Sequence, residues 1–373
     1  MKRFFCAVLI VCLGLGTFYI NAVNVTAKSA ILINGHTGEV LYSINQNQRL
    51  PMASTTKIMT GLLLCEYGNF EREITVNREM VAVEGSSMGL LVGDKVTLHD
   101  LLYGLLLASG NDAANVIAYA VAGSVSEFVA LMNKKASEIG LENTNFVTPS
   151  GLDSAEHYTT ASDMAKLASY ALKNDQFAKA VSTKTATLNY GNPPYRRRLS
   201  NHNKLLNMYD GAVGVKTGYT KKSGRCLVSA AKRDGRLLIA VTLNDSNDWA
   251  DHKQMLDYGF SVTQKTEICK QMEFQVPIIG GKEQFLKLNV DSYYLGTTDK
   301  EGFSYEIFLP KFVYAPINDK EIIGKIVYKK YDNIIDEIEI KANKNVDKLE
   351  ARVDVLKATK EIYRYIFMKI WEN

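Results

Sequence analysis

The chain has 373 residues, of which 46% are hydrophobic and 23% are charged, and its net charge is +4. This length exceeds one typical domain and predicts two or three, and the composition is that of an ordinary globular protein with enough apolar residues for a core. The positive charge is too small and too dispersed to indicate a nucleic-acid partner.

The first 27 residues have the pattern of a signal peptide. Lys2 and Arg3 precede an apolar run from Phe4 to Ile20, and Val25-Thr26-Ala27 offers the small or compact residues that a signal peptidase reads. We therefore predict an exported protein from which residues 1–27 are removed. An uncleaved anchor is the alternative, because the run is slightly long for a signal peptide and slightly short for a spanning helix.

The cysteines that follow this segment predict no disulfide framework. They are Cys65, Cys226 and Cys269, an odd number without paired spacing. We expect them to be small buried side chains.

From residue 30 to 262 the sequence alternates between strand and helix patterns. Strands are expected at 30–34, 40–43, 213–217, 226–231 and 237–243, the first two as a hairpin. Helices are expected at 58–64, at 98–121 with a break at 108–112, and at 125–139, 162–174 and 249–258. Gly110 and its polar neighbours cause the break, so Ser109 and Asn111 should lie on the turn between two helices.

From about residue 268 to 345 the chain changes to short alternating runs between turn signals, which predicts a small all-β domain. Its strands are expected at 274–276, 286–290, 305–308, 321–328 and 334–340. No catalytic group of residues is found there, so we expect a spacer or interaction domain.

The last stretch, 346–373, contains neither glycine nor proline and predicts an amphipathic helix. Val355, Ile362, Ile366 and Ile370 are spaced for one face, with aromatic residues beside them and most basic residues elsewhere. Such a helix is typical of an anionic membrane surface. Packing against the β domain or against a second subunit is the alternative.

The stretch Ser54-Thr55-Thr56-Lys57 places a nucleophile beside a base at the start of the first helix. Residues three apart share a helix face, so the Ser54 hydroxyl and the Lys57 amine are expected side by side. A serine hydroxyl needs such a base at neutral pH, and free N–H groups at a helix start can hold an oxyanion. The same spacing at Ser229 and Lys232 falls in a predicted strand, where the two side chains point to opposite faces.

Two more motifs follow in order. Ser109-Gly110-Asn111 supplies a hydroxyl and an amide on the predicted turn, and Lys216-Thr217-Gly218 ends a strand before a tight turn. Together with Ser54-x-x-Lys57 they match the signature of class A β-lactamases and penicillin-binding proteins. Here the chain resembles the low-molecular-weight penicillin-binding proteins that are D-alanyl-D-alanine carboxypeptidases.

The resemblance covers about residues 30–262 and extends beyond the three motifs. The further segments that resemble the family are Gly85-Ser86-Ser87-Met88, Asp112-Ala113-Ala114, Thr144-Asn145-Phe146, Gly151-Leu152, Thr160-Ala161-Ser162-Asp163-Met164-Ala165 and Tyr219-Thr220. The resemblance implies an α/β (α+β) catalytic domain of the serine β-lactamase/penicillin-binding-protein type over 28–262, with an antiparallel sheet and a helical subdomain. The all-β domain at 268–345 and the membrane-surface helix at 346–373 would complete the family's architecture.

The resemblance also implies the partners and the location. The substrates would be peptidoglycan stem peptides that end in D-Ala-D-Ala, and β-lactam antibiotics would be covalent inhibitors. The terminal helix would contact the membrane, at the outer face of the bacterial cytoplasmic membrane or in the cell wall space. No cofactor is implied, and no metal site is expected because the five histidines lack metal-ligand spacing.

Four residues take catalytic roles in this interpretation. Ser54 would attack the carbonyl of the penultimate D-Ala, and Lys57 would take its proton if burial and a neighbouring charge keep the amine partly neutral. Ser109 would pass a proton to the leaving amine, and Asn111 would orient Lys57 and the substrate amide.

Substrate binding is assigned to the third motif and its surroundings, namely Lys216, Thr217, Gly218, Tyr219 and His202. Lys216 and Thr217 would hold the free carboxylate, and the backbone N–H of Tyr219 would share the oxyanion with that of Ser54. Some family members place an arginine near 248–252 to hold this carboxylate, and this chain has none there. The interpretation therefore leaves the carboxylate to Lys216, Thr217 and His202.

Three alternatives remain open. A class A β-lactamase needs a glutamate that directs the deacylating water, and Glu142 lies in the relevant interval but opens the Asn-Phe loop instead. A D,D-endopeptidase would act on cross-linked peptides with the same residues. A non-catalytic wall-binding protein would have the same fold without turnover.

Overall fold

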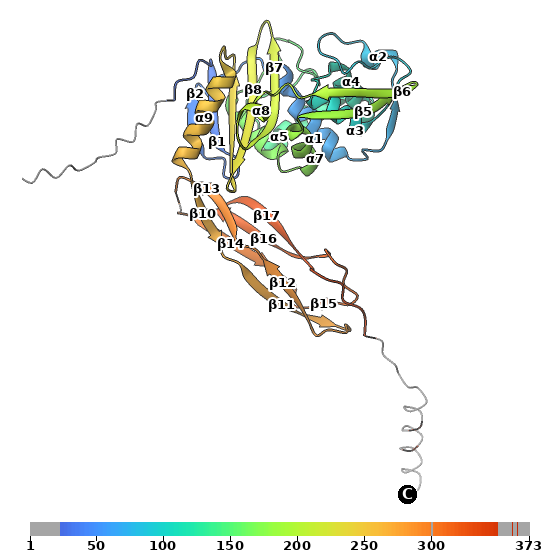
Figure 1. Cartoon of the computed structure of the whole chain (residues 1–373), viewed down its shortest axis with the longest axis vertical. Coiled ribbons are helices and arrows are strands. Elements are labelled where there is room, and N and C mark those ends of the chain that lie inside the picture. The colour runs from blue at the N-terminus through green and yellow to red at the C-terminus, as the bar shows by residue number, and fades with distance from the viewer. Residues whose placement is uncertain (1–22, 300, 350–359, 361–363, 365–373) are drawn as a thin grey trace, which may run out of the picture. The chain divides into compact units, whose positions relative to one another are not determined.

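The structure is a computed structural model that describes residues 23–299, 301–349, 360 and 364. These residues divide into two units, which Figure 1 shows with their labelled elements. The first unit comprises the described residues up to Ile33, Val40–Lys232 and Leu238–Val262, and the second comprises Asn34–Glu39, Arg233–Leu237 and the described residues from Thr263 onward. Most of the predicted signal segment and most of the predicted terminal helix lie outside the described residues.

A five-stranded sheet, in the order β2-β1-β9-β8-β7, is the centre of the first unit. Its strands are β1 (Ser29–Asn34), β2 (Val40–Ile44), β7 (Ala212–Thr220), β8 (Gly224–Arg233) and β9 (Arg236–Leu243). β1 and β2 form the predicted antiparallel hairpin, and β7 and β8 are antiparallel with Tyr219 opposite Arg225. All five strands fall where the sequence predicts them.

Helices and two small strand pairs make up the rest of this unit. The helices are η1 (Ala53–Thr56), α1 (Lys57–Tyr67), α2 (Arg78–Val81), α3 (Leu98–Leu106), α4 (Asn111–Ala122), α5 (Val125–Ile139), α6 (Ala161–Ala171), α7 (Asp175–Ser182), α8 (Leu205–Met208) and α9 (Asp248–Val262). The strand pairs are β3 (Glu73–Thr75) with β4 (Lys95–Thr97) and β5 (Thr185–Gly191) with β6 (Pro194–Ser200). The antiparallel sheet and the helical subdomain confirm the predicted fold class.

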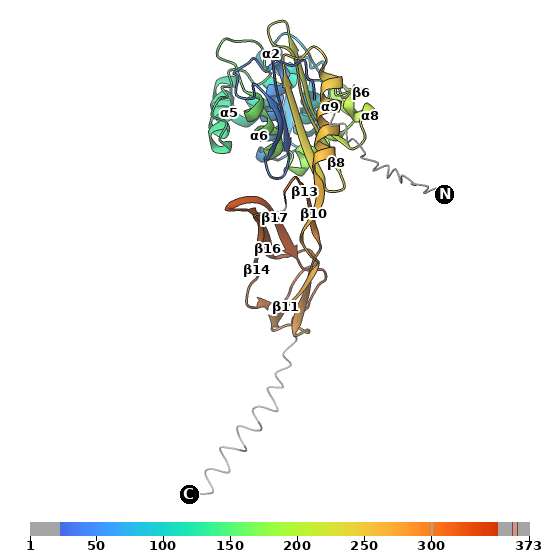
Figure 2. The ribbon, with the colours of Figure 1, turned by 90° about the vertical axis from the view of Figure 1, so that its left-hand side faces the viewer.

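The sheet has a helix layer on each side. Leu32 and Leu227 of the sheet pack with Leu205 of α8 and Met255 of α9, and Figure 2 shows α9 lying along this face. On the other side, η1 and α7 pack against β7. Behind η1, α1 is buried without a break from Lys57 to Cys65. A helix that is apolar all round belongs in a core, and this one forms a rigid base for the residues at its start.

One predicted detail differs at that start. The sequence predicts Ser54 on the first turn of an α-helix, but Ala53–Thr56 form a 3₁₀ turn and α1 begins at Lys57. Ala53 has a left-handed φ of 47°, which tightens the chain just before Ser54. Tight turns of this kind are common at helix ends, and periodicity alone does not reveal them.

Residues at the predicted cleavage site pack onto the first unit. Val25 and Ala27 belong to the apolar cluster beneath α9. Thr26 donates its backbone N–H to Asp251 at 2.6 Å and its hydroxyl to Asp245 at 2.8 Å. Both acids are buried and need polar partners, so these hydrogen bonds tie the segment around Thr26 to the first unit.

The second unit is all β over its described residues between Thr263 and Leu349, as the sequence predicts. Its strands are β10 (Gln264–Cys269), β11 (Met272–Ile279), β12 (Phe285–Val290), β13 (Tyr293–Thr297), β14 (Phe303–Phe308), β15 (Val313–Tyr314), β16 (Ile322–Lys330) and β17 (Asn333–Lys341). They form the pair β10-β13 and the sheets β12-β11-β15 and β14-β16-β17. Alternate residues of β12 are buried, and Leu286 and Leu288 enter the shared core with Ile326 and Ile340.

Two further findings concern the whole described chain. Cys65, Cys226 and Cys269 are free and buried, as the sequence predicts. Within the described residues no single helix is long and apolar enough to cross a membrane, and α4 with α5 meets that test only as a pair bent by 84°.

Candidate active site

Ser54 and Lys57 meet at the junction between η1 and α1. Lys57 Nζ lies 2.8 Å from Ser54 Oγ, although the two residues are on a 3₁₀ turn and an α-helix. The Lys57 side chain is fully buried, and burial, followed by the charge of Lys216, lowers the pKa of its amine well below the ordinary 10.5. A neutral amine next to a hydroxyl is the arrangement that activates a serine.

The other neighbours of Lys57 show how this amine is oriented. Asn111 donates its Nδ2 to the Glu84 carbonyl at 2.6 Å, which turns its Oδ1 toward Lys57 Nζ at 2.7 Å. The Ser150 carbonyl accepts from the same nitrogen at 2.7 Å. A neutral amine has two N–H groups and one lone pair, and both of these oxygens can only accept. The lone pair therefore faces Ser54 Oγ, whose hydroxyl can donate its proton along this contact.

Ser109 and Lys216 form a second pair beside the first. Ser109 lies between α3 and α4 with a left-handed φ of 58°, and Lys216 Nζ donates to its Oγ at 3.1 Å. Lys216 is buried, and burial lowers the pKa of its amine to about 7. At neutral pH Ser109 therefore contacts an amine that can give or accept a proton.

Gly218 lets β7 approach the nucleophile closely. A Cβ at this position would lie 3.0 Å from the backbone nitrogen of Ser54 and 3.1 Å from the carbonyl oxygen of Met52. Any larger residue would push the strand away from η1. The glycine of the third motif therefore keeps the backbone N–H groups of β7 beside that of Ser54, where an oxyanion would form.

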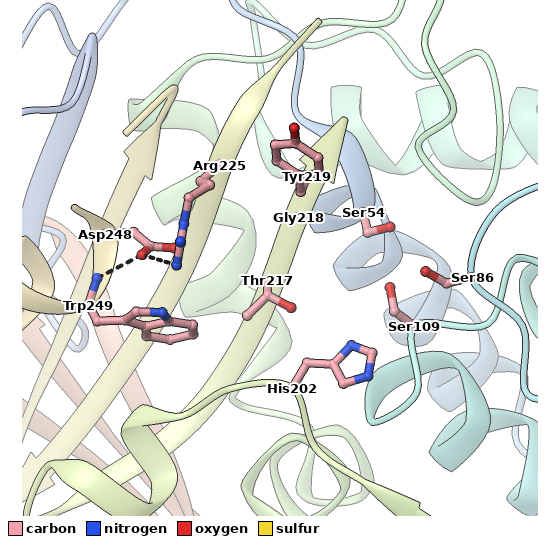
Figure 3. A pocket seen from close by; sticks show the side chains of 10 residues that line it. All are labelled: Ser54, Ser86, Ser109, His202, Thr217, Gly218, Tyr219, Arg225, Asp248 and Trp249. Carbon is pink, nitrogen blue, oxygen red and sulfur yellow. Dashed lines mark hydrogen bonds and ion pairs between the residues drawn. The ribbon is translucent and has the colours of Figure 1, made fainter. Parts of the chain in front are cut away.

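These residues surround a pocket of about 500 Å³. Its lining comprises Ser54, Ser86, Ser109, His202, Thr217, Gly218, Tyr219, Arg225, Asp248 and Trp249, all drawn in Figure 3. Lys57, Asn111 and Lys216 lie behind this lining and are linked to it by the hydrogen bonds described above. The structure thus brings together all nine site residues that the sequence predicts.

His202 and Tyr219 have different surroundings within this pocket. His202 is partly buried, and burial and the nearby charge of Lys216 lower the pKa of its imidazole. It is therefore held mainly in the neutral form, which donates or accepts hydrogen bonds without adding charge. Tyr219 is exposed at the pocket rim.

Comparison with known proteins identifies the family. The model of the D-alanyl-D-alanine carboxypeptidase family matches residues 17–247. The chain belongs to the D-alanyl-D-alanine carboxypeptidase family. It is 36% identical over 336 residues to the D-alanyl-D-alanine carboxypeptidase DacF of Bacillus subtilis, covering 86% of each chain.

Solved structures agree with this membership. Penicillin-binding protein 5 from Haemophilus influenzae has a TM-score of 0.62 at 26% identity, over 87% of this chain and 98% of that one. The Streptomyces K15 DD-transpeptidase has a TM-score of 0.61 at 35% identity, over 64% of this chain and 99% of the other. The first of these spans both units, and the shared fold confirms the penicillin-binding-protein architecture expected from the three motifs.

Arg225 is the main pocket residue that was not predicted from the sequence. It lies on β8 directly opposite Tyr219, and its Nη2 donates to Asp248 Oδ1 at 2.6 Å. The guanidinium carbon lies 5.9 Å from the centre of the Trp249 ring, and 43% of the side chain is exposed. Figure 3 shows these three side chains side by side at the end of the pocket beyond Thr217. The sequence has no arginine near Asp248, because the cation comes from β8, the strand beside β7.

The pocket wall opposite β7 depends on Asp112, another residue without a predicted role. Its carboxylate accepts the backbone N–H of Met88 at 3.0 Å and those of Gly89 and Leu90 at 3.1 Å each, and the Ser87 hydroxyl at 2.5 Å. These bonds hold the segment that carries Ser86 into the pocket. The sequence signals for this wall were the segments Gly85–Met88 and Asp112–Ala114, which resemble the family.

His157 supports the third side, where the Ser150 carbonyl meets Lys57. Its Nδ1 accepts the backbone N–H of Val147 at 2.9 Å, so its Nε2 carries the proton that faces Thr56 Oγ1 at 2.7 Å. Burial lowers the pKa of this imidazole to about 4. The ring thus links η1 to the loop that ends at Ser150.

The second Ser-x-x-Lys match behaves as the sequence predicts. Ser229 is buried on β8 and its hydroxyl lies 2.5 Å from Nδ1 of His252, whereas Lys232 is exposed. The spacing that joins Ser54 to Lys57 therefore separates this pair. No group of three or more His, Cys, Asp or Glu residues suited to a metal occurs in the described part of the chain.

Proposed function

We propose that this protein is a serine-type D-Ala-D-Ala carboxypeptidase that removes the terminal D-Ala from peptidoglycan stem pentapeptides through an acyl-enzyme on Ser54. One observation carries the proposal. Lys57 Nζ lies 2.8 Å from Ser54 Oγ, while its two other neighbours are oxygens that only accept. The lone pair of a neutral Lys57 is thus available to the Ser54 proton and to nothing else around it.

Acylation begins when Ser54 Oγ attacks the carbonyl carbon of the penultimate D-Ala. The hydroxyl proton moves to Lys57 Nζ as the new C–O bond forms. The carbonyl oxygen becomes an oxyanion that accepts from the backbone N–H groups of Ser54 and Tyr219, which the close approach at Gly218 keeps together. Asn111 and the Ser150 carbonyl hold the charged Lys57 in place after the transfer.

The C–N bond then breaks, and the nitrogen of the terminal D-Ala needs a proton to leave as an amine. Ser109 is the proposed donor, and its hydroxyl is resupplied by Lys216, whose Nζ is 3.1 Å away. In deacylation a water oxygen bonds to the ester carbonyl carbon as the C–O bond to Ser54 breaks. Lys57 returns its proton to Ser54 Oγ, and the proton that the water loses restores the charge of Lys216, which releases the shortened peptide and regenerates the enzyme. Overall, one peptide bond and one water molecule are converted into one carboxylic acid and free D-Ala.

The free carboxylate of the substrate requires a cation that stays charged. Lys216 has a pKa lowered to about 7 and uses its N–H groups on Ser109 and on the Thr217 carbonyl at 3.1 Å. An arginine side chain carries a permanent charge in proteins, and Asp248 engages only Nη2 of Arg225. We therefore place the carboxylate between the Thr217 hydroxyl and Arg225, with His202 at the side.

The reaction places the enzyme outside the cytoplasm, where peptidoglycan is built. We propose that the chain reaches this site through its signal segment and lies at the outer face of the cytoplasmic membrane, with the amphipathic stretch 346–373 on the lipid surface. β-Lactam antibiotics, whose amide replaces the D-Ala-D-Ala bond, would acylate Ser54 in the same pocket.

The test is release of D-Ala from a diacyl-Lys-D-Ala-D-Ala peptide. Ser54→Ala should abolish release while preserving the thermal unfolding midpoint. Ser43→Ala is the control, because Ser43 is an exposed serine on β2 that does not line the pocket. Equal release by the wild type and Ser54→Ala would refute the proposal, and no release by the wild type would favour a wall-binding protein.

Two assays separate the related activities. Sustained hydrolysis of a chromogenic cephalosporin, in place of one labelling event per molecule, would identify a β-lactamase. Cleavage of a cross-linked dimeric peptide at a rate above that for the free pentapeptide would identify an endopeptidase.

A further inference from the structure

The outer face of the sheet β12-β11-β15 carries an apolar patch. Val276 and Ile278 of β11 and Leu286 of β12 point into the core of the second unit, so their neighbours along each strand point outward. We call the outward set the tip patch, and its members are Pro277, Ile279, Phe285, Phe312 and Tyr314.

The strand register makes this patch continuous. Phe285 is opposite Pro277, and Ile279 is opposite Tyr314. The rings of Phe312 and Tyr314 are in edge contact, with centroids 5.5 Å apart. Ile279 and the three aromatic residues are 44–65% exposed, and soluble monomers seldom expose apolar side chains over adjoining strands in this way.

The chain leaves the described region beside the tip patch. Lys348 forms a bridge with Gly281, and the backbone N–H of Leu349 donates to the Gly280 carbonyl at 2.8 Å. Leu349 is itself 62% exposed. The stretch that follows is the one for which the sequence predicts an amphipathic membrane-surface helix. A lipid surface that binds that stretch would therefore also contact the tip patch.

The charges around the patch suit a lipid surface. Lys282 pairs with Asp347 at 2.9 Å, and Lys344 pairs with Glu283 at 2.5 Å, so these acids are neutralised. Lys311 and Lys348 make no ion pair with a described residue. Exposed aromatic rings beside lysines are what the interface between lipid headgroups and acyl chains favours.

We infer that the tip patch is a second lipid-contacting element, which inserts its aromatic side chains into the headgroup region of the membrane next to the predicted terminal helix. This inference rests on the proposed location at the membrane. Two contacts from adjoining parts of the chain bind a bilayer far more tightly than either contact alone, because the second is intramolecular once the first is made.

The experiment measures binding of the full-length mature chain to vesicles of phosphatidylethanolamine and phosphatidylglycerol. The patch variant is Ile279→Ser/Phe285→Ser/Tyr314→Ser, and the control is Ile322→Ser/Ile334→Ser/Ile338→Ser, which removes exposed aliphatic residues from β16 and β17 of the same unit. We expect the patch variant to lose roughly 10-fold or more in partition coefficient and the control to match the wild type. Equal binding by the wild type and the patch variant would overturn the inference.

A direct readout does not depend on how much the terminal stretch contributes. In Tyr314→Trp, the emission of the new tryptophan is obtained by subtracting the wild-type spectrum. Its emission maximum should shift to shorter wavelength when vesicles are added, and brominated lipid should quench it. An unshifted Trp signal from a vesicle-bound chain would overturn the inference. A wild-type protein that is a dimer without lipid, and a patch variant that is a monomer, would also overturn it, because the patch would then bind a second copy of the chain. Release of D-Ala from the soluble peptide should be unchanged in all of these variants, so failure of the inference is separable from failure of the proposed enzyme activity.

Discussion

Arg225→Leu tests the carboxylate-binding end of the pocket. The substitution keeps an apolar stem and removes the guanidinium that we place against the substrate carboxylate. A charge-assisted hydrogen bond contributes about 1.5–3 kcal/mol. Because 43% of this side chain is exposed, solvent weakens the interaction and we take the lower part of that range, about 1.5–2 kcal/mol. This corresponds to a fall in kcat/KM of roughly 10–30-fold, mainly through KM, since the carboxylate is bound equally before and during the reaction.

The assay compares diacyl-Lys-D-Ala-D-Ala with the same peptide ending in a carboxamide. Arg225→Leu should cleave the free acid more slowly than the wild type does, whereas the two enzymes should hydrolyse the carboxamide at the same rate. Arg198→Leu, an exposed arginine on β6, is the matched charge control and should leave both rates unchanged. An equal loss on both peptides would mean that Arg225 acts through folding or through Asp248. No loss on either peptide would refute a role in carboxylate binding.

Three further outcomes follow from the structure. Acylation by penicillin should rise with pH as Lys57 loses its proton below the ordinary 10.5, and a rate independent of pH in the wild type would contradict a lysine base. Lys57→Arg, which stays protonated, should acylate roughly 10²–10⁴-fold more slowly. Gly218→Ala should reduce the rate of acylation by roughly 10²-fold with little change in the unfolding midpoint, because the new Cβ would lie 3.0 Å from the Ser54 backbone nitrogen. An unchanged acylation rate in stopped-flow measurements would show that β7 accommodates the methyl group without loss of function. The packing of residues 25–27 onto the fold favours an earlier cleavage than the one after Ala27 that the sequence predicts, so N-terminal sequencing of the secreted protein should place the mature start before Val25. A start at residue 28 would show that this packing is dispensable.

The elements with strong local patterns were predictable. α5 runs from Val125 to Ile139, which is the predicted range, because its cap Ser124 and its apolar period agree. The strands β10 and β13 were missed because buried and exposed residues do not alternate regularly along them, and because their pairing, Thr266 with Leu295, joins separate segments of the chain. Local periodicity carries no information about such a partner.

The candidate site likewise contains residues that local sequence motifs reveal and groups that they do not. Ser54, Lys57 and the other motif residues were found because each motif is local in sequence. Arg225 was missed because its link to the site is the register of β7 and β8, which places it opposite Tyr219. The Ser150 carbonyl was missed because a backbone atom leaves no signature in residue type.

The central claim is that Ser54 forms the acyl-enzyme, and the most direct measurement is the mass of its tryptic peptide after reaction with penicillin. Cleavage after Arg49 and Lys57 isolates residues 50–57, which contain Ser54 as their only serine. We predict that this peptide gains the mass of one penicilloyl group in the wild type and gains none in Ser54→Ala. A penicilloyl group on any other peptide, or none on the wild-type protein, would contradict the account.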